Sequence, residues 1–323
     1  MERNHSKLVT IFGGSGFVGR YVVRSLANRG WRVRVAVRRP DLAGFLKPLG
    51  AVGQVVPIQA NVRDDASVAA AVANTHAVVN LVGILTESGK QTFDAVQADG
   101  AERIAKAAAA AGVGRFVQMS AIGADAGSSS AYARSKAAGE EAAKAANADT
   151  IVVRPSIVFG PEDDFFNRFA SMARISPVLP VVGPDTRFQP VYAADVAAFI
   201  AAAVEGDVPA GQTYELGGPD VMTFRELLDM MLEITRQKRK VVALPEGIAR
   251  VQAKLMSVLP KPPLTTDQIE LLKSDNVVSE AAEVQGRTMG AAAITPTSMA
   301  AILPTYLWTY RKHGQFAEPG SAA

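Results

Sequence analysis

The amino-acid sequence predicts an α/β protein in which a doubly wound parallel sheet is followed by a smaller C-terminal lobe. Three observations lead to this fold class. Short apolar stretches alternate with alanine-rich helical stretches through the first half, the first stretch runs into a glycine-rich turn, and the alternation stops near Gly160. Repeated strand–helix–strand units with right-handed crossovers form a parallel sheet that helices cover on both faces.

The expected elements follow the hydrophobic pattern along the chain. Six short apolar runs of the first half are interpreted as strands: Leu8–Phe12, Arg32–Val37, Val55–Ala60, Ala77–Val82, Arg115–Ser120 and Thr150–Arg154. Helices are expected between them at Val18–Asn28, Ala66–Ala73, Thr92–Ala111 and Ala131–Ala146. Further along we expect a helix at Ala193–Val204, a strand at Thr213–Leu216, and helices at Phe224–Thr235 and Ile248–Val258.

We expect three parts in the chain. Residues 1–160 are predicted to form the sheet domain, and residues 161–285 a smaller substrate or partner lobe with segments that return to the sheet. Residues 286–323 are expected to form an apolar, aromatic tail. Its aromatic residues and the following Arg311-Lys312 resemble an interfacial membrane anchor, whereas the alternative, slightly favoured, is that they pack on their own lobe.

The composition excludes several kinds of site. The 323 residues include no cysteine, so disulfides, thiolate zinc sites and a cysteine nucleophile are ruled out. Three histidines, far apart in the sequence, predict no metal site. The net charge of +3 is a weak bias toward anions such as phosphates or acidic lipid and does not indicate nucleic acid. The segment before the first expected strand, residues 1–7, is short and polar, unlike a signal peptide. We therefore expect a cytoplasmic location in a bacterium, or a mature organellar chain whose leader has been removed.

The first expected strand ends in a glycine-rich turn with the spacing Gly13-x-x-Gly16-x-x-Gly19, and a helix begins inside it. Glycine permits the tight turn and lets the backbone approach a pyrophosphate, to which the helix N-terminus offers free N–H groups. A tight strand–helix turn without a ligand is the simpler explanation. Its place in a strand–helix–strand unit near the N-terminus favours a nucleotide site, and hence a Rossmann, NAD(P)-binding domain. The expected contacts are Gly13, Ser15, Gly16, Phe17, Val18 and Gly19.

The second expected strand ends in Arg38 and Arg39, where NAD-selective sites usually place an acidic residue. Two arginines suit a 2′-phosphate through charge-assisted hydrogen bonds, so NADP(H) is the preferred cofactor and NAD(H) the alternative. An exposed basic turn without a ligand is the other explanation. Residues after the third and fourth strands are placed to flank the adenine and the ribose: Asn61, Val62, Leu81, Val82 and Gly83.

A serine, a tyrosine and a lysine form a candidate catalytic set. Ser120 closes the fifth expected strand, and Tyr132 and Lys136 lie one turn apart on the next helix. A nearby ammonium favours tyrosinate, so Tyr132 is suited to give or take a proton near neutral pH, and Ser120 to hold a carbonyl or hydroxyl. Tyr-x-x-x-Lys also occurs by chance on helices; after the glycine motif it is a strong signal.

Together these motifs resemble a short-chain dehydrogenase/reductase of the extended or atypical kind. The segments Val153–Gly160 and Pro190–Val196 are also typical of that group. The resemblance, over about residues 7–220, implies that Tyr132 acts as acid/base with Lys136 as its electrostatic partner. It also implies further cofactor contacts, from Gln97, Met119, Tyr132, Lys136, Pro155 and Ile157.

Three segments resemble one branch of the group more closely: Ser128–Lys136, Phe165–Met172 and Pro263–Gln268. That branch is the nucleotide-binding accessory subunit (39 kDa-type) of respiratory complex I, the NADH:ubiquinone oxidoreductase, with its bacterial relatives. The resemblance implies a tightly held nucleotide that serves structure, and docking on subunits of complex I. It also implies a place on the cytoplasmic face of the inner membrane, with peripheral membrane contact.

The chain departs from the general extended pattern in three places. Gln97 stands where an asparagine often helps organise the active site, and Asn61 replaces a frequent aspartate beside the adenine. Only eleven residues separate Ser120 from Tyr132, which argues against a large sugar-nucleotide substrate.

Two functions therefore remain open: a structural nucleotide-binding subunit of complex I, and an NADPH-dependent reductase or dehydrogenase of a small carbonyl or hydroxyl substrate.

Overall fold

The computed structural model describes residues 7–256, 264–312 and 314. Its contacts divide the chain into two compact units. The sheet unit consists of residues 1–155, 193–216 and 278–295, and the second unit of residues 156–192, 217–277 and 296–323. Within the described residues no helix is both long enough and apolar enough to cross a membrane.

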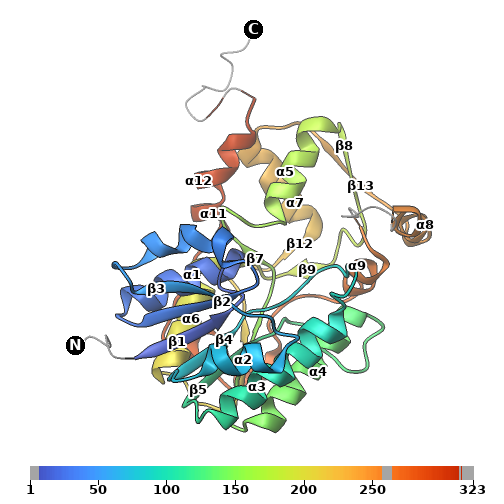
Figure 1. Cartoon of the computed structure of the whole chain (residues 1–323). Coiled ribbons are helices and arrows are strands. Elements are labelled where there is room, and N and C mark those ends of the chain that lie inside the picture. The colour runs from blue at the N-terminus through green and yellow to red at the C-terminus, as the bar shows by residue number, and fades with distance from the viewer. Residues whose placement is uncertain (1–6, 257–263, 313, 315–323) are drawn as a thin grey trace. The chain divides into compact units, whose positions relative to one another are not determined.

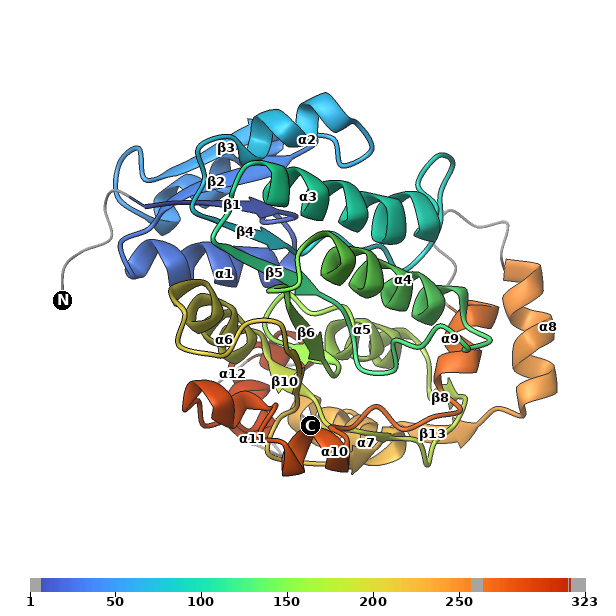
Figure 2. The same ribbon diagram turned by 90° about the horizontal axis from the view of Figure 1, so that it is seen from below.

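The sheet unit is built on a seven-stranded parallel sheet in the order β11-β6-β5-β4-β1-β2-β3 (Figures 1 and 2). This arrangement confirms the predicted doubly wound fold class. The first strand of the chain, β1, lies between β2 and β4, with Val9 beside Val33 and Ala77. In chain order the strands are β1 (Leu8–Phe12), β2 (Arg32–Val37), β3 (Val55–Gln59), β4 (Ala77–Asn80), β5 (Arg115–Met119), β6 (Ile151–Pro155) and β11 (Thr213–Leu216).

Helices cover both faces of this sheet. On one face α1 (Phe17–Asn28) packs against α6 (Ala193–Glu205), and on the other α2 (Asp65–Val72), α3 (Asp99–Ala110) and α4 (Ala131–Ala146) lie side by side (Figure 2). Their small, alanine-rich faces bring the helices close to the β-branched side chains of the strands. The short helices α10 (Glu280–Val284) and η3 (Met289–Ala292, a 3₁₀ turn) also belong to this unit.

The expected strands and most helices lie where the sequence predicted them, within one or two residues at each end. The helix expected at Thr92–Ala111 is present, but its first part is not α-helical. A π-helical turn, η2 (Asp94–Ala98), precedes α3 there. The widened turn sets the Gln97 carbonyl oxygen 2.4 Å from where a Cβ on Gly139 of α4 would lie, so only glycine allows this approach. The 3₁₀ segment η1 (Pro40–Leu49), with Pro48 inside it, was not predicted.

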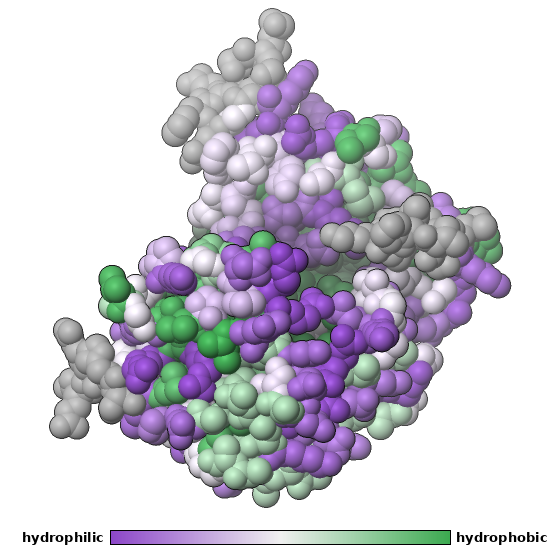
Figure 3. All heavy atoms as spheres, in the orientation of Figure 1, coloured by the Kyte–Doolittle hydropathy of each residue, from purple (hydrophilic) through white to green (hydrophobic). Residues whose placement is uncertain are grey.

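Polar residues cover most of the sheet unit on the face seen in Figure 3, with hydrophobic side chains between them. Leu42 in η1 and Val52, just before β3, are two of its exposed large apolar side chains.

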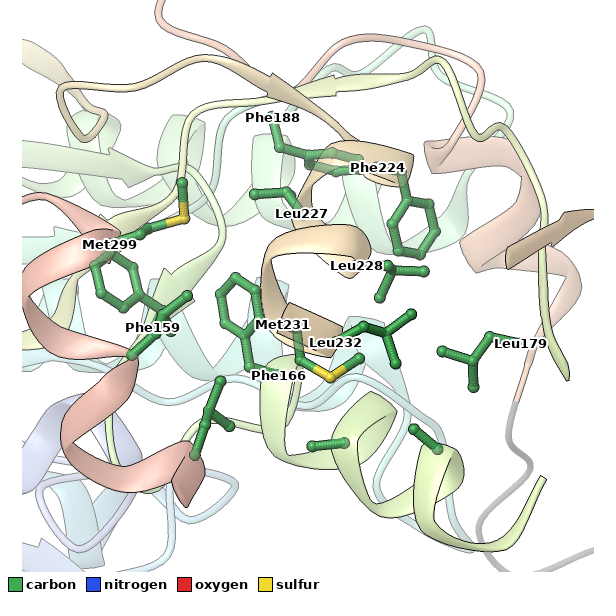
Figure 4. Packing of buried hydrophobic residues seen from close by; sticks show 14 of the residues in the cluster. Phe159, Phe166, Leu179, Phe188, Phe224, Leu227, Leu228, Met231, Leu232 and Met299 are labelled. Carbon is green, nitrogen blue, oxygen red and sulfur yellow. The ribbon is translucent and has the colours of Figure 1, made fainter. Parts of the chain in front are cut away.

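The second unit has its own core, in which aromatic and aliphatic side chains of α5 (Phe166–Ile175) and α7 (Phe224–Thr235) meet (Figure 4). Phe166, Phe224 and Met231 are among its buried members. Three two-stranded pairs frame it: β7 (Val158–Phe159) with β10 (Val191–Tyr192), β9 (Arg187–Phe188) with β12 (Met222–Thr223), and β8 (Val178–Val181) with β13 (Lys240–Ala243). The helix α5 was not predicted. Helices α8 (Glu246–Met256) and α9 (Thr266–Leu271) pack on each other in a small separate cluster.

The described part of the C-terminal segment folds onto the second unit. Helices α11 (Met299–Ile302) and α12 (Pro304–Leu307) and the 3₁₀ turn η4 (Trp308–Tyr310) follow one another there. Tyr306 is buried, and the Tyr310 hydroxyl donates a hydrogen bond to Asn167 Oδ1 (2.9 Å). Of the two interpretations of these aromatic residues, packing on their own unit is the one that the structure shows for both tyrosines.

Candidate dinucleotide site and the Ser–Tyr–Lys set

The glycine loop between β1 and α1 is packed too closely for side chains at several positions, among them Gly13 and Gly19. Gly13 has a φ of +77°, and a Cβ there would lie 3.0 Å from the carbonyl carbon of Leu81, at the end of β4. A Cβ on Gly19 would lie 2.5 Å from the Gly13 carbonyl oxygen. The motif therefore does two structural jobs: it turns the chain sharply, and it seats the first turn of α1 against the loop.

The N-terminus of α1 is open for an anion. Its N-cap is Gly16, no side chain caps the helix, and the first turn contains no acidic residue. The N–H groups of the first turn lack helical acceptors, and the helix dipole adds positive potential there. The predicted contacts Ser15, Phe17 and Val18 lie in or beside this turn. An uncapped 12-residue helix behind a glycine loop fits a pyrophosphate.

The two arginines after β2 differ in their partners. Arg39 forms a two-pronged ion pair with Asp41, with 2.8 Å between Nη2 and Oδ2. Arg38 Nη1 instead donates to the side-chain oxygen of Gln91 (2.7 Å). Among the described residues Arg38 has no carboxylate partner, so its charge is the one available to a phosphate.

The ends of β3 and β4 carry the residues expected to flank the adenine and ribose. Asn61 is used in its own turn: its N–H donates to Ser67 Oγ (2.9 Å), and its Oδ1 accepts from the N–H of Arg63 (3.1 Å). After β4, the Leu81 N–H bonds the Phe12 carbonyl of β1 (2.9 Å). Val62, Val82 and Gly83 follow at the same carboxyl edge of the sheet, where such sheets bind ligands.

Tyr132 and Lys136 lie on α4, whose first turn is capped by Ser130 through the N–H of Ala133 (3.1 Å). Lys136 is 8% exposed, and its Nζ lies 5.8 Å from the centre of the Tyr132 ring. Burial lowers the pKa of its ammonium to about 8, and the negative charge of Glu140 opposes part of that shift. In the described part of the chain Lys136 Nζ makes no hydrogen bond.

Glu140 is committed elsewhere. It lies one turn beyond Lys136 and accepts two hydrogen bonds from Arg154 of β6, from Nε (2.8 Å) and Nη2 (2.7 Å). The hydrogen bond with Glu140 raises the pKa of Arg154. Arg154 is therefore the principal counter-ion of Glu140, and Lys136 shares its charge only in part. Sequence reasoning did not single out Glu140, although its i+4 spacing from Lys136 was a usable signal.

Two buried polar atoms of predicted site residues have no hydrogen-bond partner among the described residues: Ser120 Oγ and Gln97 Oε1. The Gln97 amide nitrogen donates to Ser135 Oγ (3.1 Å), which in turn donates to the Tyr132 carbonyl (2.8 Å). A Cβ on Gly83 would lie 3.1 Å from Lys136 Nζ and 3.3 Å from Gln97 Oε1, so both groups face the same point of backbone. Buried polar groups are usually hydrogen-bonded, so these two atoms without partners indicate a place for polar ligand atoms.

The remaining predicted residues lie in different surroundings. Met119 is half-buried at the end of β5, and Pro155 is buried in β6 beside Leu216 of β11. Ile157 belongs to the second unit, where it packs against that unit's core. The glycine loop, Arg38, the ends of β3 and β4, and the Ser120–Tyr132–Lys136 set all belong to the sheet unit.

The profile of the NAD dependent epimerase/dehydratase family matches residues 9–217. This chain belongs to that family. The match covers the sheet domain through β11, including the glycine loop and the Ser–Tyr–Lys set.

Curated relatives extend the similarity over most of the chain. NADH dehydrogenase (ubiquinone) 1 alpha subcomplex subunit 9 of Arabidopsis thaliana is 38% identical over 286 residues, which cover 84% of this chain and 71% of that protein. The NADH-ubiquinone oxidoreductase 40 kDa subunit of Neurospora crassa is 31% identical over 311 residues, 96% of this chain and 81% of that one. The predicted resemblance to these complex I subunits is thereby confirmed. A ceramide reductase of Caulobacter vibrioides is 32% identical over 241 residues, 74% of each chain.

Solved structures of the same fold are more distant in sequence. The dTDP-glucose 4,6-dehydratase DesIV of Streptomyces venezuelae, solved with NAD, superposes with a TM-score of 0.70 at 21% identity, over 95% of this chain and 97% of that one. The NADPH-dependent quinone oxidoreductase QOR2 of Escherichia coli gives the same TM-score at 20% identity, over 93% and 98%. At this identity the likeness supports the fold alone.

Proposed function

We propose that this protein binds a nicotinamide dinucleotide, with preference for NADP(H), and serves as an accessory subunit docked on respiratory NADH:ubiquinone oxidoreductase. The observation that carries the proposal is the identity of 31–38% with named subunits of that complex, over most of both chains. The proposed location is the cytoplasmic face of the inner membrane, reached by docking on the complex. Peripheral contact with lipid is part of the same proposal.

The site residues divide the nucleotide between them. The N–H groups at the start of α1 hold the pyrophosphate, and Arg38 takes the 2′-phosphate. Asn61, Leu81 and their neighbours flank the adenosine. Tyr132 and Lys136 stand at the nicotinamide end, where Gln97 Oε1 and Ser120 Oγ offer unpaired oxygen atoms.

The burial of Lys136 supports a tightly held ligand. A protonated lysine without hydrogen bonds is destabilising in the free protein, and a ligand that accepts a hydrogen bond from it removes that penalty. A nucleotide that satisfies Lys136, Ser120 and Gln97 together would contribute to the stability of the fold as well as to any reaction.

The test is gentle detergent extraction of the tagged protein from its own cells, followed by a native gel. Co-migration with the NADH:ubiquinone oxidoreductase is expected, with nucleotide retained by the protein. Migration as a small free species in detergents that leave the complex intact would overturn the docking role.

A second function has its own support. We propose as the alternative an NADPH-dependent reductase, because the Ser120, Tyr132 and Lys136 set is intact and a ceramide reductase is 32% identical over three quarters of each chain. NADPH would supply the hydride to a carbonyl carbon. Tyr132 would give its phenolic proton to the carbonyl oxygen, Lys136 would favour the resulting tyrosinate, and Ser120 would hold the oxygen in place.

A single variant separates the two functions. Tyr132→Phe keeps the ring, and with it the edge-to-face packing on Phe93 (5.9 Å between ring centres), but removes the proton. Loss of substrate-dependent NADPH oxidation in this variant, with nucleotide still bound, would support the reductase. Unchanged oxidation would exclude Tyr132 chemistry, and unchanged docking would be expected for the accessory subunit.

A further inference from the structure

A tight hairpin follows β4 at the carboxyl edge of the sheet. Ser88 and Gln91 exchange two backbone hydrogen bonds of 3.0 Å, with Gly89 turning the chain at a φ of +56°. Next to the hairpin, Glu87 Oε1 accepts a hydrogen bond from the N–H of Phe93 (2.7 Å), just before η2. The hairpin Ser88–Gln91 is therefore an ordered element beside the adenosine end of the predicted nucleotide site.

Two arginines from different strand ends reach neighbouring residues of this hairpin. Arg38, after β2, donates from Nη1 to Gln91 Oε1 (2.7 Å). Arg63, after β3, donates from Nη1 to the Lys90 carbonyl oxygen (3.0 Å). Arg38, Arg63 and Lys90 are all exposed. The hairpin thus gathers three cationic residues in one place.

Nothing in the described chain neutralises these charges. Arg38 and Arg63 form no ion pair there, and each spends one of its five N–H donors on a neutral oxygen. The acidic residues next to Arg63 in the sequence are engaged: Asp64 caps α2 through the N–H of Ser67 (2.7 Å), and Asp65 pairs with Arg103. Near Lys90, Glu87 accepts its hydrogen bond from the N–H of Phe93. By contrast, Arg39 is already paired with Asp41.

A dianionic phosphate is the ligand that such a cluster fits best. Guanidinium groups present donors in a planar fork that matches phosphate oxygens, and Lys90 adds a mobile point charge. Converging like charges repel one another, and a bound dianion reverses that repulsion. Neutral partners such as the Gln91 amide and the Lys90 carbonyl hold the arginines in place without consuming their charge.

We propose that Arg63 and Lys90, which the sequence motifs did not single out, complete with Arg38 the site for the 2′-phosphate of NADP(H). Gln91 is a positioning residue that aims Arg38. This inference rests on the proposed binding of a dinucleotide at the sheet unit. It also reassigns the second arginine of the site, since Arg63 takes the role that the sequence had suggested for Arg39.

The experiment compares the dissociation constants of NADPH and NADH by calorimetry, in wild type and in Arg63→Gln, Lys90→Gln and Arg39→Gln. We expect Arg63→Gln to weaken NADPH by about tenfold or more and NADH by less than about twofold. Lys90→Gln should give a smaller loss with the same selectivity. Arg39→Gln is the matched control, a neighbouring exposed arginine with a carboxylate partner, and should change neither constant by more than about twofold.

A fragment pair gives an independent readout. Adenosine 2′,5′-bisphosphate should bind wild type more tightly than AMP does, and Arg63→Gln should abolish most of that difference. The advantage of the bisphosphate should also fall with added salt more steeply in wild type than in the variant.

The possible outcomes are distinct. If wild type binds NADPH over NADH and Arg63→Gln preserves the ratio, the inference is wrong while dinucleotide binding stands. An equal loss of both nucleotides in Arg63→Gln would also overturn it, because Arg63 would then act on the shared part of the ligand. If wild type binds neither nucleotide, the proposed function fails and takes this inference with it.

Discussion

Lys136 in the sheet unit and Asp163 in the second unit are both buried ionisable side chains, and their surroundings differ. Lys136 of the sheet unit is 8% exposed and Asp163 of the second unit 3%. Burial moves both groups toward their neutral forms, lowering the pKa of Lys136 to about 8 and raising the pKa of Asp163. Their hydrogen bonding differs completely.

Asp163 is fully engaged. Its Oδ1 accepts from the N–H groups of Phe166 (2.6 Å) and Asn167 (3.2 Å), and its Oδ2 from the N–H of Gly160 (3.2 Å) and the Tyr306 hydroxyl. Among the described residues, Lys136 has only the ring of Tyr132 and the shared charge of Glu140. A buried charge whose oxygen atoms all accept hydrogen bonds from the protein stabilises the fold. A buried charge without hydrogen bonds among the described residues, in the same unit as the unpartnered atoms Ser120 Oγ and Gln97 Oε1, is arranged for a ligand.

The largest effect on stability is expected from replacing Asp163. Asp163→Ala leaves the N–H groups at the start of α5 and the Tyr306 hydroxyl without acceptors, so it should lower the free energy of unfolding by about 3 kcal/mol. Urea unfolding followed by circular dichroism measures this loss. Asp164→Ala, at the exposed neighbouring position, is the control and should change stability by less than about 0.5 kcal/mol.

Replacing Lys136 should change the free energy of unfolding in the opposite direction. Lys136→Met keeps the chain length and removes a charge that is disfavoured in the fold, so the nucleotide-free protein should gain on the order of 2–3 kcal/mol near pH 7. Between about pH 8 and pH 10.5 the unfolded chain holds the proton that the fold has released. Wild-type stability should therefore rise with pH through that window relative to the variant, and fall back as pH drops toward 8.

Two measurements check this prediction together. Thermal unfolding of nucleotide-free Lys136→Met across pH 7–11 should show the gain shrinking as pH rises, and calorimetry should show weaker binding of NADPH. A variant less stable than wild type at pH 7 would mean that Lys136 is a structural residue like Asp163, and the contrast between the two units would collapse.

A smaller effect is expected from removing one of the hydrogen bonds to Asp163. Tyr306→Phe removes one donor to Asp163 and should cost about 1–2 kcal/mol near neutral pH. Since that donor holds the Asp163 pKa down, its loss should raise the pKa further. Protonated Asp163 is the form favoured by burial, so the deficit should be smallest below the unfolded pKa of Asp163 and grow as pH rises through the folded one. Equal deficits at pH 3.5 and pH 7 would contradict the coupling.

The fold followed from the sequence because its signals are local and periodic. The strands of the parallel sheet are short, mostly buried runs rich in apolar residues, and α4 begins at Ala131 as expected. The π turn before α3 was not predictable from the local pattern, because it packs closely against Gly139, which lies on another helix. The α5 helix was missed because it is held by Asp163 and by aromatic packing from distant segments.

The candidate site was predictable only where a motif has a fixed spacing. The glycine loop and Tyr132-x-x-x-Lys136 could be recognised in the sequence, since the residues of each motif lie only a few positions apart. The difference between Arg38 and Arg39 does not, because it depends on which of them meets Asp41 and which meets Gln91, more than fifty residues away. The pairing of Glu140 with Arg154, which leaves Lys136 short of charge, is likewise a contact between a helix and a strand.

The finest test of the comparison uses two buried serines of the sheet unit. Ser120 Oγ has no hydrogen-bond partner in the described part of the chain, whereas Ser130 Oγ caps α4. Ser120→Ala should leave the stability of the nucleotide-free protein unchanged or raise it by up to about 1 kcal/mol, and Ser130→Ala should lower it by about 1 kcal/mol. Nucleotide binding or turnover should respond to Ser120→Ala alone. If both variants lose stability equally, the Ser120 hydroxyl is a structural group. The buried polar groups of the site that lack hydrogen-bond partners are then not arranged for a ligand.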